Sequence, residues 1–499
     1  MEGTRVKILN DIIDWVKDQS AQKIFWLTGW AGTGKSAISW TVCSRANNDP
    51  EIVLGGSFFF SRSASSAALH DGRCVIPTLA QVLARQSDVF SQALTEELTR
   101  DPDILHKQIS VQVEKLLSKP LRALASSPVP IVFVIDALDE CAGHLTGSGD
   151  LHDAGTNHIV SEILEALFTL FGTDADLPVK FLVTSRPETH IRDTPVSDHK
   201  LSKILRLQTV DKDQVTKDIR LYIASKLFST PRLCTRFMQS DADILAQQCD
   251  GLFIVATTAL KYTFDLGHDA AAMRFKTMLN ASRSGLSTRA AAPLDRMYTM
   301  ILEDAARIDE RVSGGLEGTL QLLAVLLSAR MILSVVALAD LLGRPTDDTR
   351  AALSRLHAVV HVPEDDGEPG LRTLHASFGD YIFRRAPDHI QISNSHSHEV
   401  SARAAVRVMA EHLHFNISQS CSSYEPNVLT KPSSITLSLE YACTQWAYHI
   451  ANLPDPSALA ELLSDIFCPR FLFWLEVMSI LGQVQRAAAM LHFLGVTVR

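Results

Sequence analysis

Three runs of apolar residues in the first two hundred positions predict buried strands. The runs are "IFWL" at 24–27, "VPIVFVI" at 129–135 and "VKFLVT" at 179–184. Each run is almost continuously apolar, as is typical of strands that are covered on both faces of a parallel sheet. Helical patterns separate the runs. This alternation of strands and helices indicates a doubly wound α/β domain.

The later parts of the chain have apolar residues at helical spacing. The segment "LAQQCDGLFIVATTALKYT" at 245–263 has apolar residues at this spacing behind a Gly turn, and the chain from about 395 to its end is amphipathic. The apolar stretch 322–343 is long enough for a membrane span, but Arg330 and Asp340 interrupt it. That interruption favours two core helices around a short turn. We therefore expect all-α regions after the sheet domain.

The first strand runs into a glycine-rich turn that matches the P-loop pattern G-x-x-x-x-G-K-[ST]. Glycines let backbone N–H groups converge on phosphate oxygens, and the N-terminus of the next helix, predicted over "AISWTVCSRA", adds positive potential. Lys35 is suited to meet the β- and γ-phosphates, and the Ser36 hydroxyl to bind Mg²⁺. The alternative is a turn that binds nothing. The candidate nucleotide-binding residues of this segment are Gly29, Gly32, Thr33, Gly34, Lys35, Ser36 and Ala37.

A second candidate segment follows the second predicted strand, where "VPIVFVIDALDEC" at 129–141 delivers three acids. The carboxyl ends of parallel strands are where open α/β sheets bind ligands. Asp136 is suited to hold Mg²⁺, directly or through water, and Glu140 or Asp139 to orient a water molecule that attacks the γ-phosphate. The alternative is an acidic surface turn after a core strand.

Arg186 follows the third predicted strand. A guanidinium at the end of a strand that neighbours both earlier strands can sense whether a γ-phosphate is present. A single Arg is a weak signal, because it can equally pair with a surface carboxylate.

Composition narrows the classes of partner. The 499 residues are 46% hydrophobic and 21% charged, which is typical of globular domains, and the length allows three or four of them. The net charge of −9 and the lack of a long Lys/Arg block argue against a dedicated nucleic-acid surface. The eight cysteines include no C-x-x-C pair, so we expect reduced thiols rather than zinc or a disulfide framework. With no signal peptide or lipidation motif, we expect a cytoplasmic protein.

Several segments together resemble the NACHT branch of the signal-transducing P-loop NTPases (the STAND class), in the form found in fungal NOD-like receptor proteins. The segments are "GWAGTGKSAI", "FFFSR" at 58–62, "VIDALDEC" and "LVTSRPE". The opening "EGTRVKILNDIIDWV" is similar to the lead-in of those proteins, where Gly-Thr-Arg lies near the nucleotide base. The resemblance covers about 1–385, with a weaker likeness through 386–450, and the paired acids after Asp136 are its most specific part.

The resemblance extends into the helical region. Residues 322–343 resemble the start of a winged-helix domain, and "LRTLHASFGDYIF" at 371–383 is similar to the winged-helix segment whose histidine contacts the β-phosphate of ADP in NOD-like receptors. His375 is the matching position. Without the resemblance, an isolated histidine is more often a structural residue.

The resemblance implies four regions. We expect a NACHT P-loop nucleotide-binding domain at 1–205, a helical domain at 206–290, a winged-helix-like domain at 291–390 and a C-terminal helical region at 391–499. Residues 142–157 are predicted as a mobile loop, and 281–293 as an interdomain connection. NOD-like receptors usually carry an effector domain before this module and a repeat array after it. Neither is found here, so the chain is expected to be a truncated product or a fragment.

The function implied is a molecular switch that binds ATP/ADP or GTP/GDP with Mg²⁺ and hydrolyses the triphosphate slowly. Exchange of the diphosphate for the triphosphate would open the module and drive homo-oligomerisation, with an unidentified upstream sensor and downstream effector. No membrane partner is expected. Two alternatives stay open: a freely cycling P-loop ATPase or kinase, and a nucleotide-bound scaffold whose hydrolysis is vestigial.

Overall fold

The computed structural model describes residues 3–61, 69, 71–125, 129–141, 154–173, 177–187, 202–229, 237–264, 268–281, 293–307, 315–420, 434–455 and 460–497. The chain divides into two compact units, Met1–Leu260 and Lys261–Arg499. The first unit contains the sheet, and the second is mainly helical. The domain boundaries predicted at 205, 290 and 390 remain predictions.

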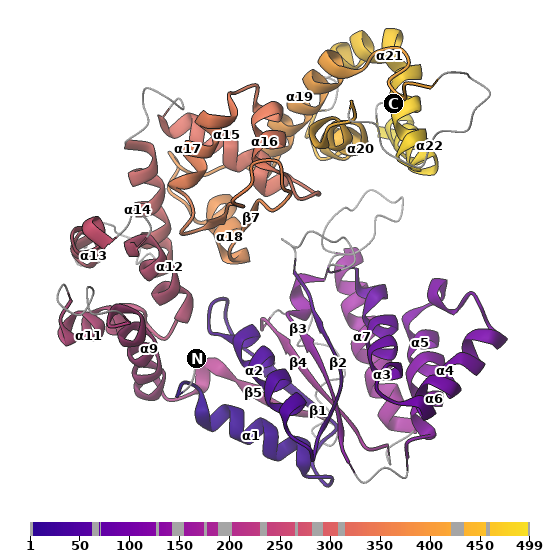
Figure 1. Cartoon of the computed structure of the whole chain (residues 1–499), viewed down its shortest axis with the longest axis vertical. Helices are drawn as coiled ribbons and strands as arrows, with labels where there is room; N and C mark the ends of the chain where they lie inside the picture. The colour runs from indigo at the N-terminus through magenta and orange to yellow at the C-terminus, as the bar shows by residue number, and fades with distance from the viewer. Residues whose placement is uncertain are drawn as a thin grey trace. The chain divides into compact units, whose positions relative to one another are not determined.

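The first unit is built on a five-stranded parallel sheet with the order β2-β3-β4-β1-β5 (Figure 1). The strands are β1 Ile24–Thr28, β2 Val53–Phe59, β3 Ile131–Asp136, β4 Val179–Ser185 and β5 Ser202–Arg206. β1, β3 and β4 correspond to the three predicted strands and form the buried middle of the sheet, as their continuous burial shows. The two edge strands were not predicted from the sequence.

Helices cover both faces of this sheet, because successive strand residues point to opposite sides. On one face Phe25 and Leu27 pack with apolar residues of α1 (Val6–Lys17) and α2 (Lys35–Asn48). On the other face Ile24 and Trp26 belong to a core that includes residues of α3 (Val75–Ala84), α4 (Asp88–Arg100) and α7 (Ala154–Thr173). The predicted doubly wound α/β P-loop fold is therefore confirmed.

Short helical segments lie between α4 and β3, and three longer helices follow β5. The short segments are η3 Ile104–His106, α5 Ile109–Gln112, the π-helix η4 Val113–Ser118 and α6 Lys119–Arg122. The longer helices are α9 Lys212–Leu227, α11 Gln239–Gln248 and α12 Phe253–Phe264. A Gly turn at Gly251 separates α11 from α12, and α12 is the helix predicted behind that turn.

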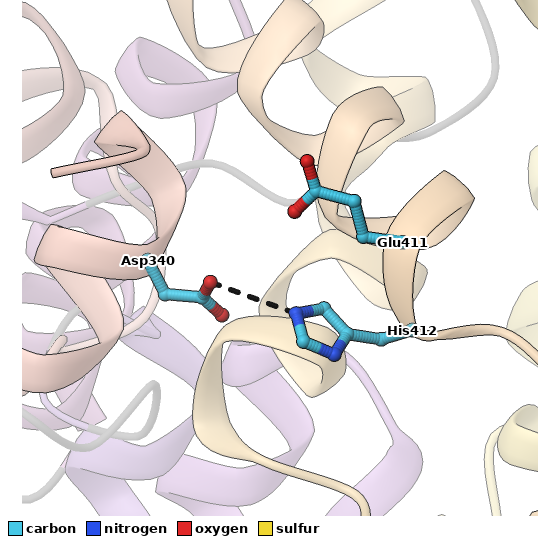
Figure 2. A group of neighbouring side chains, drawn as sticks. All are labelled: Asp340, Glu411 and His412. Carbon is cyan, nitrogen blue, oxygen red and sulfur yellow. Dashed lines mark ion pairs between the residues drawn. The ribbon is translucent and has the colours of Figure 1, made fainter.

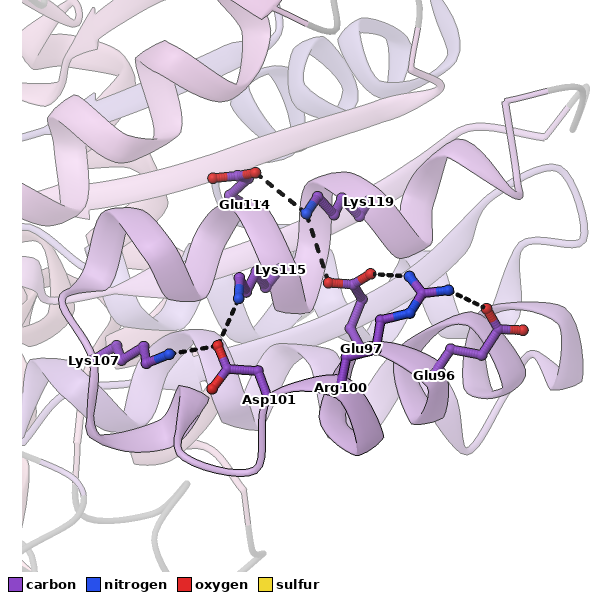
Figure 3. Close-up of polar contacts among 8 residues, drawn as sticks. All are labelled: Glu96, Glu97, Arg100, Asp101, Lys107, Glu114, Lys115 and Lys119. Atoms are coloured by element: carbon purple, nitrogen blue, oxygen red, sulfur yellow. Dashed lines mark hydrogen bonds and ion pairs between the residues drawn. The ribbon is translucent and has the colours of Figure 1, made fainter.

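A network of charged side chains joins α4 to these short segments (Figure 3). Arg100 pairs with Glu97 at 2.8 Å, and Asp101 accepts from Lys107 at 2.5 Å and from Lys115 at 2.6 Å. The hydrogen bonds from the two lysines lower the pKa of Asp101 to about 2. Ion pairs near the surface contribute little to stability on average, so we interpret this network as a feature of the domain surface.

The second unit begins with helices and a small hairpin. α13 His268–Ala281 and α14 Pro293–Arg307 precede α15 Gly315–Ser328, α16 Val335–Leu342 and α17 Thr346–Ser354. The antiparallel pair β6 Val360–His361 and β7 Arg372–Thr373 follows, and then α18 Ala376–Arg384. α15 and α16 are the two core helices that were predicted within 322–343.

The last part of the second unit is helical, as predicted. Its helices are α19 Asn394–His412, α20 Leu437–Ala451, α21 Ala460–Ile480 and α22 Val484–Thr497. Within the described ranges, no helix combines the length and the apolar character of a membrane span. All-α structure after the sheet domain, apart from the short hairpin, agrees with the sequence pattern.

Two predicted connections fall mainly outside the described residues. Of the loop predicted over 142–157, residues 142–153 are not described, and 154–157 belong instead to α7, which begins at Ala154. This part of the loop prediction was wrong, because the helix starts before the apolar positions that define its buried face. The predicted connection 281–293 lies between the end of α13 and the start of α14, and residues 282–292 are outside the described ranges.

Candidate nucleotide-binding site

The candidate site lies at the carboxyl ends of three neighbouring strands. β4 pairs with β1 on one side and with β3 on the other, with Leu27 opposite Thr184 and Ile135 opposite Val183. The glycine-rich turn after β1, the acidic turn after β3 and Arg186 after β4 therefore lie along one edge of the sheet. The strand that carries Arg186 does neighbour both of the other strands.

The glycine-rich turn depends on glycine for two physical reasons. Gly32 and Gly34 have φ angles of +79° and +94°, which other residues rarely adopt. In addition, a Cβ atom at Gly32 would lie 2.0 Å from Cγ2 of Ile254, and the Ile254 amide donates to the Gly32 carbonyl at 3.2 Å. Residue 32 must therefore be glycine both for the shape of the turn and for the close approach of α12.

Lys35 is held by the turn that precedes it. Its Nζ donates to the carbonyl of Gly29 at 2.8 Å and to that of Trp30 at 3.2 Å, and the residue is 9% exposed. Burial lowers the pKa of Lys35, while the carboxylates of the acidic turn raise it and Arg186 lowers it further. The ammonium of Lys35 therefore lies within electrostatic reach of the acids and of Arg186.

The N-terminus of α2 fits a phosphate group. Its N-cap residue is Gly34, which has no side chain that could cap the first amides of the helix. Uncapped amides at a helix N-terminus are suited to anionic oxygens. Ser36 is exposed in the first turn, so its hydroxyl is accessible for a cation, and Ala37 is exposed beside it. Thr33, which is 5% exposed, instead donates its hydroxyl to the Trp30 carbonyl at 2.9 Å.

Asp136 is the last residue of β3 and is 1% exposed. Its Oδ1 accepts hydrogen bonds from the hydroxyls of Ser39, at 2.7 Å, and Thr184, at 2.6 Å. The next residue, Ala137, has a φ of +54°, a conformation that is uncommon outside glycine. The chain therefore turns sharply after Asp136 and enters the 3-10 helix that carries the other two acids.

The other two acids of the turn have different surroundings. Asp139 is 4% exposed, and its two oxygens accept from Arg186, one from the backbone amide at 2.9 Å and the other from Nε at 3.1 Å. Glu140 is half-buried at the end of η5 (Leu138–Glu140). Arg186 thus pairs with a buried acid of the candidate site.

The lead-in to α1 also reaches the glycine-rich turn. A nitrogen of the Arg5 guanidinium, Nη2, donates to the Thr33 carbonyl at 3.1 Å, and the group lies 5.2 Å from the ring centre of Phe253. Burial lowers the pKa of Arg5, and Asp218 opposes this effect. The Nε and Nη1 atoms are buried without a hydrogen-bond partner among the described residues. Two donors beside the turn are therefore available to an acceptor group.

His375 lies in the second unit, where it is the N-cap residue of α18. Its Nδ1 accepts from the backbone amide of Ser377 at 3.1 Å, and Ser377 Oγ is 2.7 Å from Nδ1 and 2.9 Å from the Tyr298 hydroxyl. A ring nitrogen that accepts an amide proton cannot carry a proton itself, so the neutral ring is protonated on Nε2. The predicted contact of His375 with a phosphate remains a prediction.

Sequence reasoning missed four residues around this site. They are Ser39, Thr184, Phe253 and Ile254. Ser39 and Thr184 had a weak signal, since each is a polar residue at a position where the helix or strand pattern predicts burial. Phe253 and Ile254 had none, because they lie more than two hundred positions beyond the turn that they contact.

A second group of metal-ligand residues occurs in the second unit, where Asp340 faces His412 near Glu411 (Figure 2). The His412 Nε2 atom is 3.6 Å from Asp340 Oδ1. However, Glu411 pairs with Arg407 at 2.6 Å, and the Ser438 hydroxyl donates to Asp340. Because other protein groups already bind both carboxylates, we do not assign a metal to this group.

Comparison with known proteins places the sequence similarity in the sheet domain. The family described as "Nephrocystin 3, N-terminal" matches residues 3–186. This range includes the P-loop, the acidic turn and Arg186. No curated protein matches the chain at a significant level.

Three solved structures align with this chain at low sequence identity. A STAND protein with a tetratricopeptide repeat sensor from Pyrococcus horikoshii aligns with a TM-score of 0.39 and 9% identity, over 99% of this chain and 65% of that chain. Cdc6p from Pyrobaculum aerophilum aligns with a TM-score of 0.34 and 10% identity, over 82% of this chain and 95% of that one. Drosophila ORC bound to DNA aligns with a TM-score of 0.29 and 13% identity, over 72% of this chain and 81% of that chain.

This chain spans 65% of the length of the STAND protein. At these TM-scores the three similarities carry no weight for function. The P-loop pattern, the order of the strands and the site at their carboxyl ends identify the first unit as an α/β P-loop NTPase domain, which helical regions follow.

Proposed function

We propose that this chain is a nucleotide-dependent molecular switch of the NACHT type. It binds ATP/ADP or GTP/GDP with Mg²⁺, hydrolyses the triphosphate slowly, and changes conformation and self-association with the nucleotide state. The observation that carries the proposal is the convergence of Lys35, the three acids and Arg186 at one sheet edge, where all four charged partners affect the pKa of Lys35.

The contacts suggest a role for each residue. Lys35 and the amides at the start of α2 would hold the phosphates, and Ser36 with Asp136 would hold Mg²⁺, which when bound offsets the negative charge of the phosphate oxygens. Glu140 would orient the attacking water. Asp139 would instead hold Arg186 in place, because both of its oxygens already accept from that residue.

The lead-in supports binding of the rest of the nucleotide. Arg5 has two buried guanidinium nitrogens without a described partner, and the group contacts both the Thr33 carbonyl and the Phe253 ring. The likeness of "GTR" to the lead-in of NACHT proteins suggests the base as the acceptor. Buried donors without an acceptor are costly, so a ligand acceptor here would add to affinity.

The switch part of the proposal rests on the second unit. Three helices and a two-stranded hairpin, α15 to β7, followed by α18, are compatible with a winged-helix domain of the kind found in NOD-like receptors. His375 starts α18 and, when neutral, carries its proton on Nε2. We propose that this N–H donates to the β-phosphate of a bound diphosphate and so stabilises a closed state, in a signalling response like that of fungal NOD-like receptors.

The test is a comparison of nucleotide binding, turnover and assembly on the whole chain. Fluorescent diphosphate and non-hydrolysable triphosphate, each with adenine or guanine, would be titrated with and without Mg²⁺, and the size of the protein measured by light scattering in each state. Turnover would be measured separately as phosphate release from ATP and from GTP. A switch should bind both nucleotides, turn over slowly and form larger species with the triphosphate.

The same measurements separate the alternatives. Fast turnover with no change in size would favour a freely cycling ATPase or kinase. Tight binding without turnover or a change in size would favour a scaffold. No binding of any of the four nucleotides would contradict the proposal as a whole.

A further inference from the structure

The carboxylate of Asp136 is oriented by two buried hydroxyl groups from different elements. Ser39 on α2 and Thr184 on β4 are both 0% exposed, and both donate to the same oxygen, Oδ1, at 2.7 and 2.6 Å. A carboxylate that accepts from two fixed donors loses most of its freedom to rotate. The plane of the Asp136 carboxylate is therefore set by α2 and β4 together.

Thr184 has a second role at the same turn. Its hydroxyl has one proton, which it donates to Asp136, and its oxygen accepts from the Ala137 amide at 2.9 Å. This amide belongs to the residue with the left-handed conformation. Thr184 thus holds both the acid and the sharp turn that leads to Asp139 and Glu140.

The two hydroxyls leave the other carboxylate oxygen unused. Every hydrogen bond from a described side chain to Asp136 goes to Oδ1, and none goes to Oδ2. A purely structural role would be satisfied by donors on either oxygen. Two donors on one oxygen, from the helix that carries Ser36 and the strand that leads to Arg186, match what a metal ligand needs.

We infer that Ser39 and Thr184 are positioning residues for the magnesium ion that Asp136 binds. They hold Oδ1 so that Oδ2 stays available to the ion or to its water. This inference rests on the proposed function, because it assumes that the chain binds a magnesium nucleotide. It goes beyond that proposal by predicting that two residues outside the P-loop pattern and the acidic turn control the affinity for the metal.

The test uses Mg²⁺ titrations of the full-length protein with a fluorescent non-hydrolysable triphosphate at a fixed concentration. For Ser39→Ala and for Thr184→Val, the Mg²⁺ concentration at half-maximal binding should rise about tenfold, the lower end of what loss of an outer partner costs a metal site. In EDTA, nucleotide affinity should stay within about twofold of the wild type. Thr184→Ser keeps the hydroxyl, so its Mg²⁺ midpoint should equal that of the wild type.

Ser44→Ala is the matched control, since Ser44 is a half-buried serine on the same helix. It should leave the Mg²⁺ midpoint unchanged. Wild-type midpoints for both Ser39→Ala and Thr184→Val, or equal losses of affinity with Mg²⁺ and in EDTA, would overturn the inference while leaving nucleotide binding intact. If Thr184→Val does not fold, Ser39→Ala decides. A wild-type protein that binds no nucleotide would overturn the proposed function itself.

Discussion

Two buried polar clusters in this molecule look alike but differ in what they leave unused. In the first unit, Asp136 accepts from Ser39 and Thr184 at the end of β3. In the second, the Nδ1 atom of His449 on α20 is 3.0 Å from Nδ1 of His398. The Nε2 atom of His449 is 2.7 Å from the Tyr441 hydroxyl. All the residues of both clusters are nearly or completely buried.

The difference lies in the remaining hydrogen-bonding capacity. The second carboxylate oxygen of Asp136 has no described partner, whereas both ring nitrogens of His449 are engaged. Asp136 also stands beside a glycine-rich turn at a strand end, and His449 is packed between helices. Burial and hydrogen bonding alone therefore do not mark a ligand site. A ligand site is marked by a buried polar group that has unused hydrogen-bonding capacity and lies where a ligand can reach it.

The largest effect should come from substitution of Lys35, which lies beside the Asp136 cluster. It should show that nucleotide binding depends on that part of the molecule and not on the His449 cluster. Lys35→Ala should weaken nucleotide binding by about a hundredfold, because it removes the cation that meets the phosphates. Tyr441→Phe, in the other cluster, should leave the affinity unchanged. The measurement is a fluorescent-nucleotide titration. Lys17→Ala removes the same charge from the surface and serves as the control. Undiminished binding by Lys35→Ala would exclude the P-loop as the site.

The next effect concerns hydrolysis and separates the roles of Asp139 and Glu140. Glu140→Gln should keep nucleotide binding and lower turnover about a hundredfold, since a positioned acid or base contributes at least this much. Phosphate release under saturating nucleotide measures it, with Glu51→Gln as a surface control. If turnover survives in Glu140→Gln and is lost in Asp139→Asn, the role belongs to Asp139.

The third effect tests the structural cluster through its pH dependence. Burial, and then the nearby His398 and Arg330, lower the pKa of His449 to about 3, from its ordinary value of 6.5. Between these values the unfolded chain binds more protons than the folded one. Stability from His449 is therefore complete above about pH 6.5 and falls, by up to about 1.4 kcal/mol per pH unit, as the pH drops toward 3.

Urea unfolding of the whole chain between pH 4.5 and 7.5 measures this dependence. His449→Gln should flatten the slope below pH 6.5, and His396→Gln, an exposed histidine on α19, should not. Nucleotide affinity, measured at the same pH values in the folded protein, should not follow the state of His449. A slope that persists in His449→Gln would assign the pH dependence to other groups.

The sequence predicted the site better than it predicted the groups that support it. The three central strands and their polar ends could be predicted because a buried strand reads as a continuous apolar run that stops at a turn. The edge strands could not: "SKILR" in β5 is mixed in character, and β2 contains Gly55 and Gly56. At an edge, pairing with a neighbour stabilises a strand whose own sequence is a weak signal.

The supporting hydroxyls depend on contacts that no local pattern encodes. Ser39 lies 97 positions from Asp136, and Thr184 lies 48 positions away. Likewise, the pairing of Asp139 with Arg186 spans 47 positions, so the sequence could not separate Asp139 from Glu140. The local sequence predicts which functional groups lie at the end of a strand. The order of the strands decides which groups then meet.

The smallest expected effect is the one that tests the switch. If the Nε2–H of His375 donates to the β-phosphate, loss of that bond should cost about 1.5 kcal/mol, roughly tenfold in affinity for the diphosphate. A non-hydrolysable triphosphate should be less affected, because the open state would not use the contact. His375→Ala should therefore weaken diphosphate binding selectively and increase the fraction of large species in light scattering. His389→Ala, a surface histidine of the same unit that lies 3.6 Å from Glu303, is the control. Equal losses for both nucleotides, with no change in assembly, would reduce His375 to a helix cap and leave the chain as an ATPase or a scaffold.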